Sequence, residues 1–399
     1  MIRAMAFAWL RVRREPGRMA LGVLGVTAIG ALLFDMLLLS NGLLVSFRER
    51  LDRSGFDVRV ISSESAVIAG PPIEDVSARV ARLERSPSIS AVQRVRVGSA
   101  DVQGRASRRH IAIAGLDFSA PVPWTLLEGT MPHGGTSPAP LVINRNLARD
   151  FHLAVGSEVV LAGRCGEASR PLPVDARVAA IAEFQNDAAD ALTAATSSDA
   201  AAALCGERDD DRADMLLIRS NPAAGGPEAA AAAARAVLPG LHALTNDQIV
   251  ERFSRVEFSY FRQLSSVLTA VTLFFGLLLI AVLLTVSINQ QLGYIAALRA
   301  LGLTRLRVMA GVLCESALLI GIGGAAAVPV GGLLSLWLDR ILRSLPGIPA
   351  DARFFVFTAH ALAIHAALLV VGAVLAAIYP MRLVAALPIA ATLRREVVS

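Results

Sequence analysis

Four long apolar stretches most constrain what this chain can fold into. They cover residues 19–45, 265–288, 308–337 and 354–379, and none contains a run of charged residues. A helix needs about 20 apolar residues to cross the hydrocarbon core of a bilayer, so each stretch is long enough. The first is also longer than the roughly 7 to 15 apolar residues of a cleavable signal peptide. We therefore expect an α-helical membrane protein with four transmembrane helices, the first being an uncleaved anchor.

The distribution of arginine predicts which ends of these helices face the cytoplasm, because short cytoplasmic loops carry an excess of positive charge. Eleven arginines lie in the N-terminal leader, the loop 289–307 and the C-terminal tail, whereas the loop 338–353 holds three arginines beside two aspartates. Both termini are therefore expected in the cytoplasm, and the long segment 46–264 outside it. This bias, together with anionic lipid at the inner surface, accounts for the net charge of +5, so nucleic acid is not an expected partner.

These assignments divide the chain into consecutive segments. They are a cytoplasmic interfacial helix (1–18), the first span (19–45), an extracytoplasmic domain (46–264), the second span (265–288), a cytoplasmic loop (289–307), the third span (308–337), an external loop (338–353), the fourth span (354–379) and a cytoplasmic tail (380–399).

Lysine is absent from the chain, and all 38 basic residues are arginine. The phosphate-binding loop of common ATPases needs a lysine after its glycines to reach the β and γ phosphates of the nucleotide. The sequence therefore predicts no nucleotide-binding domain of that type, and no cofactor, in this chain.

The external segment is expected to be an α+β domain between the first two spans. Period-two alternation bounded by turn residues predicts strands, and NRNLARDFHL and EDVSARVARLERSP are typical of helices. The predicted strands are 56–62, 91–102, 109–117, 140–144, 156–163 and 175–184.

A change in composition near residue 186 favours a second subdomain over about residues 186–245. It begins with the alanine-rich ALTAATSSDAAAAL, which we expect to be helical. Residues 246–264 are polar with no helix breaker before the second span, which predicts a continuous stalk helix with Asn246 as its N-cap.

Several stretches of the sequence, taken in their order along the chain, resemble parts of one known family. LLEGTMP, PLVINRNLARDFHLAVGSEVVLAG and VDARVAAIAEF resemble the external core domain of MacB-like, FtsX-like ABC transporter permeases. LRALGLTRLRVMAGVLCESALLIGIGG resembles the loop and third span of the same family, and YPMRLVAALPIAATLRRE its closing tail. The resemblance extends over nearly the whole chain. It is to the type VII, mechanotransmission permeases, which include macrolide, lipoprotein-releasing and heterocyst-glycolipid exporters.

The cytoplasmic loop contains two short helical patterns. Tyr294, Leu298 and Leu301 fall on one helical face, Gly302 is placed to end that helix, and Thr304 can cap the next one. The resemblance implies that this loop docks on a separate ATP-binding subunit, with Arg299 and Arg305 available to its acidic groups. A simple surface turn between two spans is the alternative. The family usually has charged residues at the positions where this chain has Gln290, Gln291 and Leu292.

Ionisable residues inside the apolar stretches are candidates for a functional role, because an unpaired charge there is costly. Asp35 lies in the first stretch, Glu315 in the third and His365 in the fourth. Asp35 and His365 are at comparable depth, so a pair between them is one expectation. A proton or substrate role, and exposure to a water-filled cavity, are the alternatives, and Glu315 also matches a glutamate of the family.

No catalytic or metal site is expected. The histidines of the external segment are scattered without a metal-ligand spacing, and no arrangement of serine, histidine and acid indicates a nucleophile. Cys165 and Cys205 lie in the oxidising compartment and can form a disulfide, although two separate thiols are an alternative.

The resemblance implies a permease subunit of a bacterial ABC exporter that expels a lipid, a lipoprotein or a hydrophobic substrate. A non-transporting FtsX-like transmitter that activates an external partner such as a cell-wall hydrolase is the alternative. The implied partners are an ABC ATP-binding subunit that holds ATP and Mg, a second permease copy in a homodimer or heterodimer, an adaptor with an outer-membrane channel, and membrane lipid. The implied location is the bacterial inner membrane.

The topology can be tested with single cysteines near residues 225 and 302 in a cysteine-free background. A membrane-impermeant thiol reagent added to intact cells should label the cysteine near residue 225 and leave the one near residue 302 unlabelled. Labelling near residue 302 from outside would contradict the arrangement.

Overall fold

A computed structural model describes residues 16–63, 70–103, 108–132, 138–164, 172–184, 187–206, 211–255, 259–290, 304–345, 348 and 353–386. The chain forms two compact units. One comprises residues 1–43, 258–341 and 353–399, and the other residues 44–257 and 342–352.

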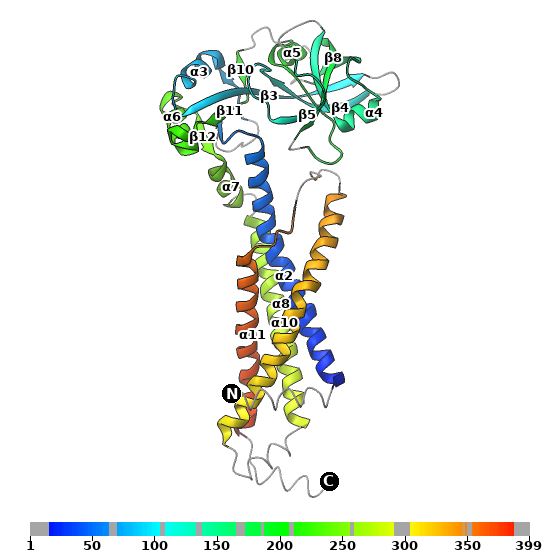
Figure 1. Ribbon diagram of the computed structural model, residues 1–399, viewed down its shortest axis with the longest axis vertical. Helices are drawn as coiled ribbons and strands as arrows, with labels where there is room; N and C mark the ends of the chain where they lie inside the picture. Colours follow the sequence, from blue (N-terminus) through cyan, green and yellow to red (C-terminus); the bar gives the residue numbers. More distant parts are fainter. Residues whose placement is uncertain are drawn as a thin grey trace. The chain divides into compact units, whose positions relative to one another are not determined.

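Four long helices build the first unit. They are α2 (Pro16–Arg53), α8 (Ser259–Gln290), α10 (Arg305–Arg343) and α11 (Ala359–Ala386), and they run alongside one another in Figure 1. Helix α2 continues past residue 43, so its last residues belong to the second unit.

Among the described residues, two helices are long and apolar enough to cross a membrane, Met19–Arg53 and Ala317–Arg343. The apolar parts of the other two are shorter, Ser266–Val282 and Ala359–Leu375. The four-span arrangement therefore stays a prediction.

A ten-stranded mixed sheet organises the second unit (Figure 1). Its strand order is β12-β1-β11-β3-β4-β9-β6-β8-β5, and β7 pairs with both β3 and β8. The strands are β1 (Val58–Ile61), β3 (Ile89–Gln103), β4 (Arg108–Leu116), β5 (Trp124–Gly129), β6 (Ala139–Asn144), β7 (Glu158–Gly163), β8 (Pro173–Phe184), β9 (Thr193–Ser197), β11 (Met215–Ser220) and β12 (His242–Thr245), and β2 (Ile73–Glu74) pairs separately with β10 (Arg212–Ala213). Each of the six predicted strands has a counterpart among them.

Helices pack on this sheet, and hydrophobic clusters lie on both of its faces. The helices are α3 (Val76–Leu83), α4 (Arg145–Phe151), α5 (Ser198–Leu204), η1 (Pro222–Ala224), α6 (Gly226–Val237) and α7 (Asn246–Arg255). Within β11, Leu216 and Ile218 join the cluster beneath α3 and α6, whereas Met215 and Leu217 join the cluster that contains Trp124. Central strands such as β11 are therefore buried on both faces.

The alanine-rich stretch 191–204 is part strand and part helix, which corrects the expectation of a continuous helix. Residues 193–197 form β9 between β4 and β6, and the helix α5 begins only at Ser198. Ala194 and Ala195 are completely buried there. Their small side chains fit a strand in the middle of the sheet, and the hydrogen bonds to two neighbouring strands outweigh the helix propensity of alanine.

The structure also divides the segment 186–245 differently from the predicted subdomain. Ala194, Ala200 and Leu204 share a cluster with β6, β7 and β8. Ala213 and the residues after it pack instead with β1 and α3. No separate core corresponds to residues 186–245 among the described residues, because long-range strand pairing distributes them over both halves of the sheet.

Thr245, rather than Asn246, caps the polar helix α7. The amide of Gln248 donates to Thr245 Oγ1, and the amide of Thr245 donates to Gln248 Oε1, both at 3.3 Å. This reciprocal pair is a capping box. Asn246 instead donates to Asp52 Oδ1 at 2.9 Å and to the carbonyl of Phe56 at 3.0 Å. Residues 256–258 lie outside the described part, so continuity between α7 and α8 stays a prediction.

Asp187 organises the turn before β9. Its carboxylate accepts hydrogen bonds from Asn144 Nδ2 at 2.6 Å and from Thr193 Oγ1 at 2.7 Å. Asn144 also caps α4, because its Oδ1 accepts from the amide of Leu147. Burial raises the pKa of the Asp187 carboxyl above its ordinary value, and the two hydrogen bonds only partly offset this effect.

Asp187→Asn should change stability in a pH-dependent way. A raised pKa in the folded state means that the protonated carboxyl stabilises the fold, and this contribution is lost as pH rises through the folded pKa. The asparagine oxygen can accept from Asn144 Nδ2 and its amide nitrogen can donate to Thr193 Oγ1, so both contacts can remain without ionisation. We expect the variant to gain stability over the parent protein as pH rises above about 4, the ordinary pKa of an aspartate, measured as the unfolding midpoint of the detergent-solubilised chain.

The matched control is Asp190→Asn, which removes an exposed carboxylate close to the same turn. An equal pH-dependent gain in that control, or no gain in Asp187→Asn, would contradict the assignment of this effect to burial of Asp187.

Candidate functional site

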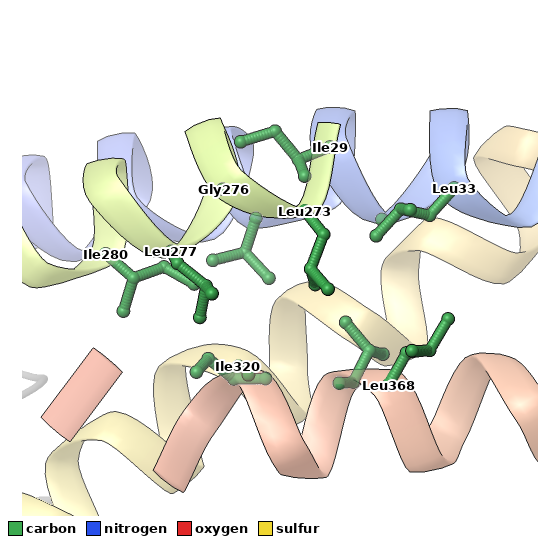
Figure 2. A pocket seen from close by; sticks show the side chains of 12 residues that line it. Ile29, Leu33, Leu273, Gly276, Leu277, Ile280, Ile320 and Leu368 are labelled. Atoms are coloured by element: carbon green, nitrogen blue, oxygen red, sulfur yellow. The ribbon is translucent and has the colours of Figure 1, made fainter. Parts of the chain in front are cut away.

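The helices of the first unit converge on an apolar centre. Figure 2 shows Ile29 and Leu33 of α2, Leu277 of α8, Ile320 of α10 and Leu368 of α11 around one small pocket. Its volume is about 30 Å³, close to that of one water molecule. The centre of the bundle is therefore nearly filled.

Small residues bring α2 and α10 into close contact. A Cβ added at Gly30 would lie 2.8 Å from the Cβ of Ala327, and one added at Gly323 would lie 2.7 Å from side-chain atoms of Val26. Gly323 and Ala327 thus face α2, and Thr27 Oγ1 donates to the carbonyl of Gly323 at 3.2 Å. This arrangement is typical of helices that pack in membranes.

Asp35 is held at the same interface by Ser335. Asp35 is 3% exposed and Ser335 is completely buried. Ser335 Oγ donates to Asp35 Oδ1 at 2.6 Å. The pair links α2 to α10 across 300 residues of sequence, and it gives the carboxyl group the hydrogen bond that burial requires.

His365 does not pair with Asp35, which corrects that expectation. The imidazole of His365 packs instead against Phe34, the residue that precedes Asp35 in α2, with ring centroids 5.1 Å apart. It is 1% exposed, and neither ring nitrogen has a hydrogen-bond partner among the described residues. Adjacent residues on a helix point in directions about 100° apart, so similar depth does not bring the two ionisable groups together.

The other predicted site residues are only partly described. Thr304 is exposed and directly precedes α10, which begins at Arg305. Cys205 is disulfide-bonded and Cys314 is a free thiol. Cys165, Tyr294, Leu298, Arg299, Leu301 and Gly302, and the side chains of Arg305 and Glu315, lie outside the described residues.

Sequence reasoning did not find a junction between the end of α2 and α7. Phe47 and Phe253 stack with ring centroids 4.7 Å apart. Arg48 Nε donates to Asp247 Oδ1 at 2.9 Å, and Asn246 bonds Asp52 as described above. The capping-box pattern Thr-x-x-Gln at residue 245 could have placed the start of α7 correctly, but no local pattern indicates its contact with α2.

These features define a membrane protein with an α+β domain inserted between its first apolar helix and a bundle of three more. A sequence model of the MacB-like periplasmic core domain matches residues 19–237, and one of the FtsX-like permease C-terminal region matches residues 266–389. The chain belongs to the MacB-like, FtsX-like family of ABC-type permeases. This family implies an inner-membrane protein, and in general an ABC ATPase partner and dimerisation.

Solved structures also resemble part of the chain. The periplasmic region of MacB from Actinobacillus actinomycetemcomitans is 9% identical, with a TM-score of 0.36, and the match covers 50% of this chain and 94% of that one. The extracellular domain of the ABC-type transporter YknZ from Gram-positive bacteria is 10% identical, with a TM-score of 0.33 and coverage of 47% and 98%. A domain of a permease protein from Porphyromonas gingivalis is 14% identical, with a TM-score of 0.32 and coverage of 48% and 88%. No curated protein sequence matches the chain.

Ser335→Ala tests the bond between α2 and α10. The change leaves the Asp35 carboxyl buried without the hydroxyl that donates to it. We expect a loss of about 0.6 kcal/mol, and at most about 1.7 kcal/mol, in the free energy of unfolding, which are the mean and the maximum measured for hydrogen bonds between membrane helices. The unfolding midpoint in mixed micelles measures the loss.

Ser266→Ala is the matched control, because within the described part of the chain Ser266 Oγ bonds the carbonyl of Gln263 in its own helix. Equal stability of Ser335→Ala and the parent protein would show that the Asp35 bond does not hold the two helices together.

Proposed function

We propose that the chain is the permease subunit of a bacterial ABC exporter that expels a lipid, a lipoprotein or a hydrophobic substrate. The observation that carries this proposal is the pair of family matches, which cover the core domain and the permease region in the order typical of such exporters. ATP would be hydrolysed, with Mg, by a separate subunit. The absence of lysine from this chain supports ATP hydrolysis by a separate subunit.

The cytoplasmic loop 289–307 is the proposed contact with the ATPase. It joins α8, which ends at Gln290, to α10, which begins at Arg305. The apolar face of Tyr294, Leu298 and Leu301 would dock on the ATPase, and Arg299 and Arg305 would bind acidic groups on it. Movement of this loop would displace both helices, because they are continuous with it.

Helix α2 is the proposed connection to the external domain. It is one unbroken helix whose last ten residues, Leu44–Arg53, belong to the second unit. There it is held to α7 by the Phe47–Phe253 stack and by the Arg48–Asp247 ion pair. A displacement of α2 would therefore be passed to α7 and to the strands β1 and β12 that flank the junction.

The proposed assembly contains two permease copies, preferably identical, and two ATPase subunits in the inner membrane, with both termini in the cytoplasm. An adaptor and an outer-membrane channel would complete a route across the envelope if the substrate leaves the cell.

Leu301→Asp should uncouple the exporter while leaving it folded and inserted. An unpaired carboxylate buried against an ATPase subunit costs several kcal/mol, and each 1.4 kcal/mol lowers occupancy about tenfold. We expect the ATPase subunit to be lost on co-purification, together with export activity in cells.

Ala296→Asp is the matched control, because at about 100° per residue position 296 falls on the side of the predicted helix opposite Tyr294, Leu298 and Leu301. Full activity and a retained ATPase subunit in Leu301→Asp would show that the loop is only a connector. Loss of both in the control would show that added charge, rather than the docking face, is responsible.

A further inference from the structure

The C-terminal part of α10 exposes one continuous face. The exposed fractions are 69% for Leu333, 61% for Leu336, 58% for Trp337 and 41% for Ile341. Arg340 is exposed as well. Because successive residues of an α-helix are about 100° apart around its axis, these five residues lie within about 140° of one another. They therefore form a single surface, which we call the α10 outer face.

The opposite side of the same helix segment packs inside the bundle. Ser335 is completely buried and donates its hydrogen bond to Asp35 of α2. Asp339 is 8% exposed on this side, and its Oδ1 accepts a hydrogen bond from the amide of Phe354 at 2.9 Å. The carboxylate that is nearest to Arg340 in sequence is therefore directed away from the α10 outer face.

The α10 outer face changes in character at Trp337. Helix α10 contains one of the two described segments that are long and apolar enough to cross a membrane, and its apolar stretch 308–337 ends at this residue. Tryptophan is enriched at the level of the lipid headgroups. Arg340 lies about 4.5 Å further along the helix axis, so its long side chain can reach the headgroup phosphates while its stem stays against hydrocarbon.

Arg340 supplies a positive charge to this end of the face. No hydrogen bond or ion pair joins it to another residue in the part of the chain that the structure describes. A guanidinium group carries five N–H donors in a planar fork, and this fork matches the oxygens of a phosphate group. The α10 outer face thus combines an apolar surface with a cation at the depth where lipid phosphates lie.

A second copy of this chain fits the face less well than a lipid does. A two-fold symmetric dimer places the same patch of both copies against each other, so two Arg340 side chains would meet without a described carboxylate between them. Charges buried without a partner are costly. A phospholipid with a net negative charge fits both parts of the face, because its acyl chains cover the leucines and its phosphate meets the arginine.

We propose that the α10 outer face is a binding site for an anionic phospholipid such as phosphatidylglycerol. The lipid phosphate accepts hydrogen bonds from Arg340, the indole of Trp337 lies at the level of the ester groups, and an acyl chain covers Leu333 and Leu336. This binding needs neither export nor an ATPase subunit, so it can be measured on the permease alone.

The test uses the full-length protein with Trp337 replaced by the photoreactive residue p-benzoylphenylalanine. Nanodiscs contain equal amounts of phosphatidylglycerol and phosphatidylcholine with the same acyl chains, and mass spectrometry identifies what is captured on irradiation. We expect lipid adducts in which phosphatidylglycerol is enriched about fivefold, which corresponds to an attraction of about 1 kcal/mol between one arginine and an anionic membrane surface. Equal capture of the two lipids, or capture of a second copy of the chain in place of lipid, would overturn the proposal.

Variants at position 340 assign the preference to the arginine. Arg340→Gln removes the charge and should remove the enrichment, whereas Arg340→Lys keeps the charge and should retain most of it. Arg177→Gln is the matched control, because it removes an exposed arginine of the second unit that pairs with Glu158. The control should leave the enrichment unchanged.

Salt gives a second measurement that needs no substitution at Arg340. The Debye length falls from about 10 Å at 0.1 M salt to about 3 Å at 1 M, so the enrichment should decrease over this range. An enrichment that persists in Arg340→Gln, or that salt does not change, would show that the arginine does not select the lipid, and the proposal would be wrong.

Discussion

Close contact between α2 and α10 is the constraint on which the helix bundle depends. In hydrocarbon, helices gain little from apolar burial against each other, so association relies on close packing and on interhelical hydrogen bonds. The residues at this contact, Gly30, Gly323 and Ala327, have small or no side chains, which lets the helices approach closely. The hydrogen bonds of Thr27 and Ser335 hold it at two levels. A larger side chain at this contact would separate the helices and lengthen both bonds.

The contact between α2 and α10 also explains why the buried residues Asp35 and His365 differ in their hydrogen bonding. Asp35 is directed toward α10 and accepts a hydrogen bond from Ser335. His365 packs on Phe34, and its ring nitrogens have no hydrogen-bond partner among the described residues. The hydrogen bond from Ser335 offsets part of the cost of burying Asp35, whereas no described group offsets that cost for His365.

In the second unit, the sheet and the helix junction depend on contacts that are distant in sequence. Strands β1, β11 and β12 come from residues 58–61, 215–220 and 242–245, yet they are neighbours in one sheet. The ends of α2 and α7 meet beside them through Phe47, Phe253 and the bond between Asp52 and Asn246. The end of α2 is therefore bonded to α7 beside a sheet whose strands come from both ends of the domain.

The sequence by itself determined the features that depend on local pattern. The apolar stretches, the six alternating strands and the helices around residues 76–83 and 145–151 could be read from periodicity and turn residues, and the quoted motifs indicated the family. Tertiary structure alone decided which groups meet. The strand β9 within an alanine-rich segment, the cap at Thr245 and the pairing of Asp35 with Ser335 instead of His365 all differ from the local expectation. Each depends on a partner brought close by the fold, and the hydrogen bonds or packing with that partner outweigh the small energetic preferences that a local pattern records.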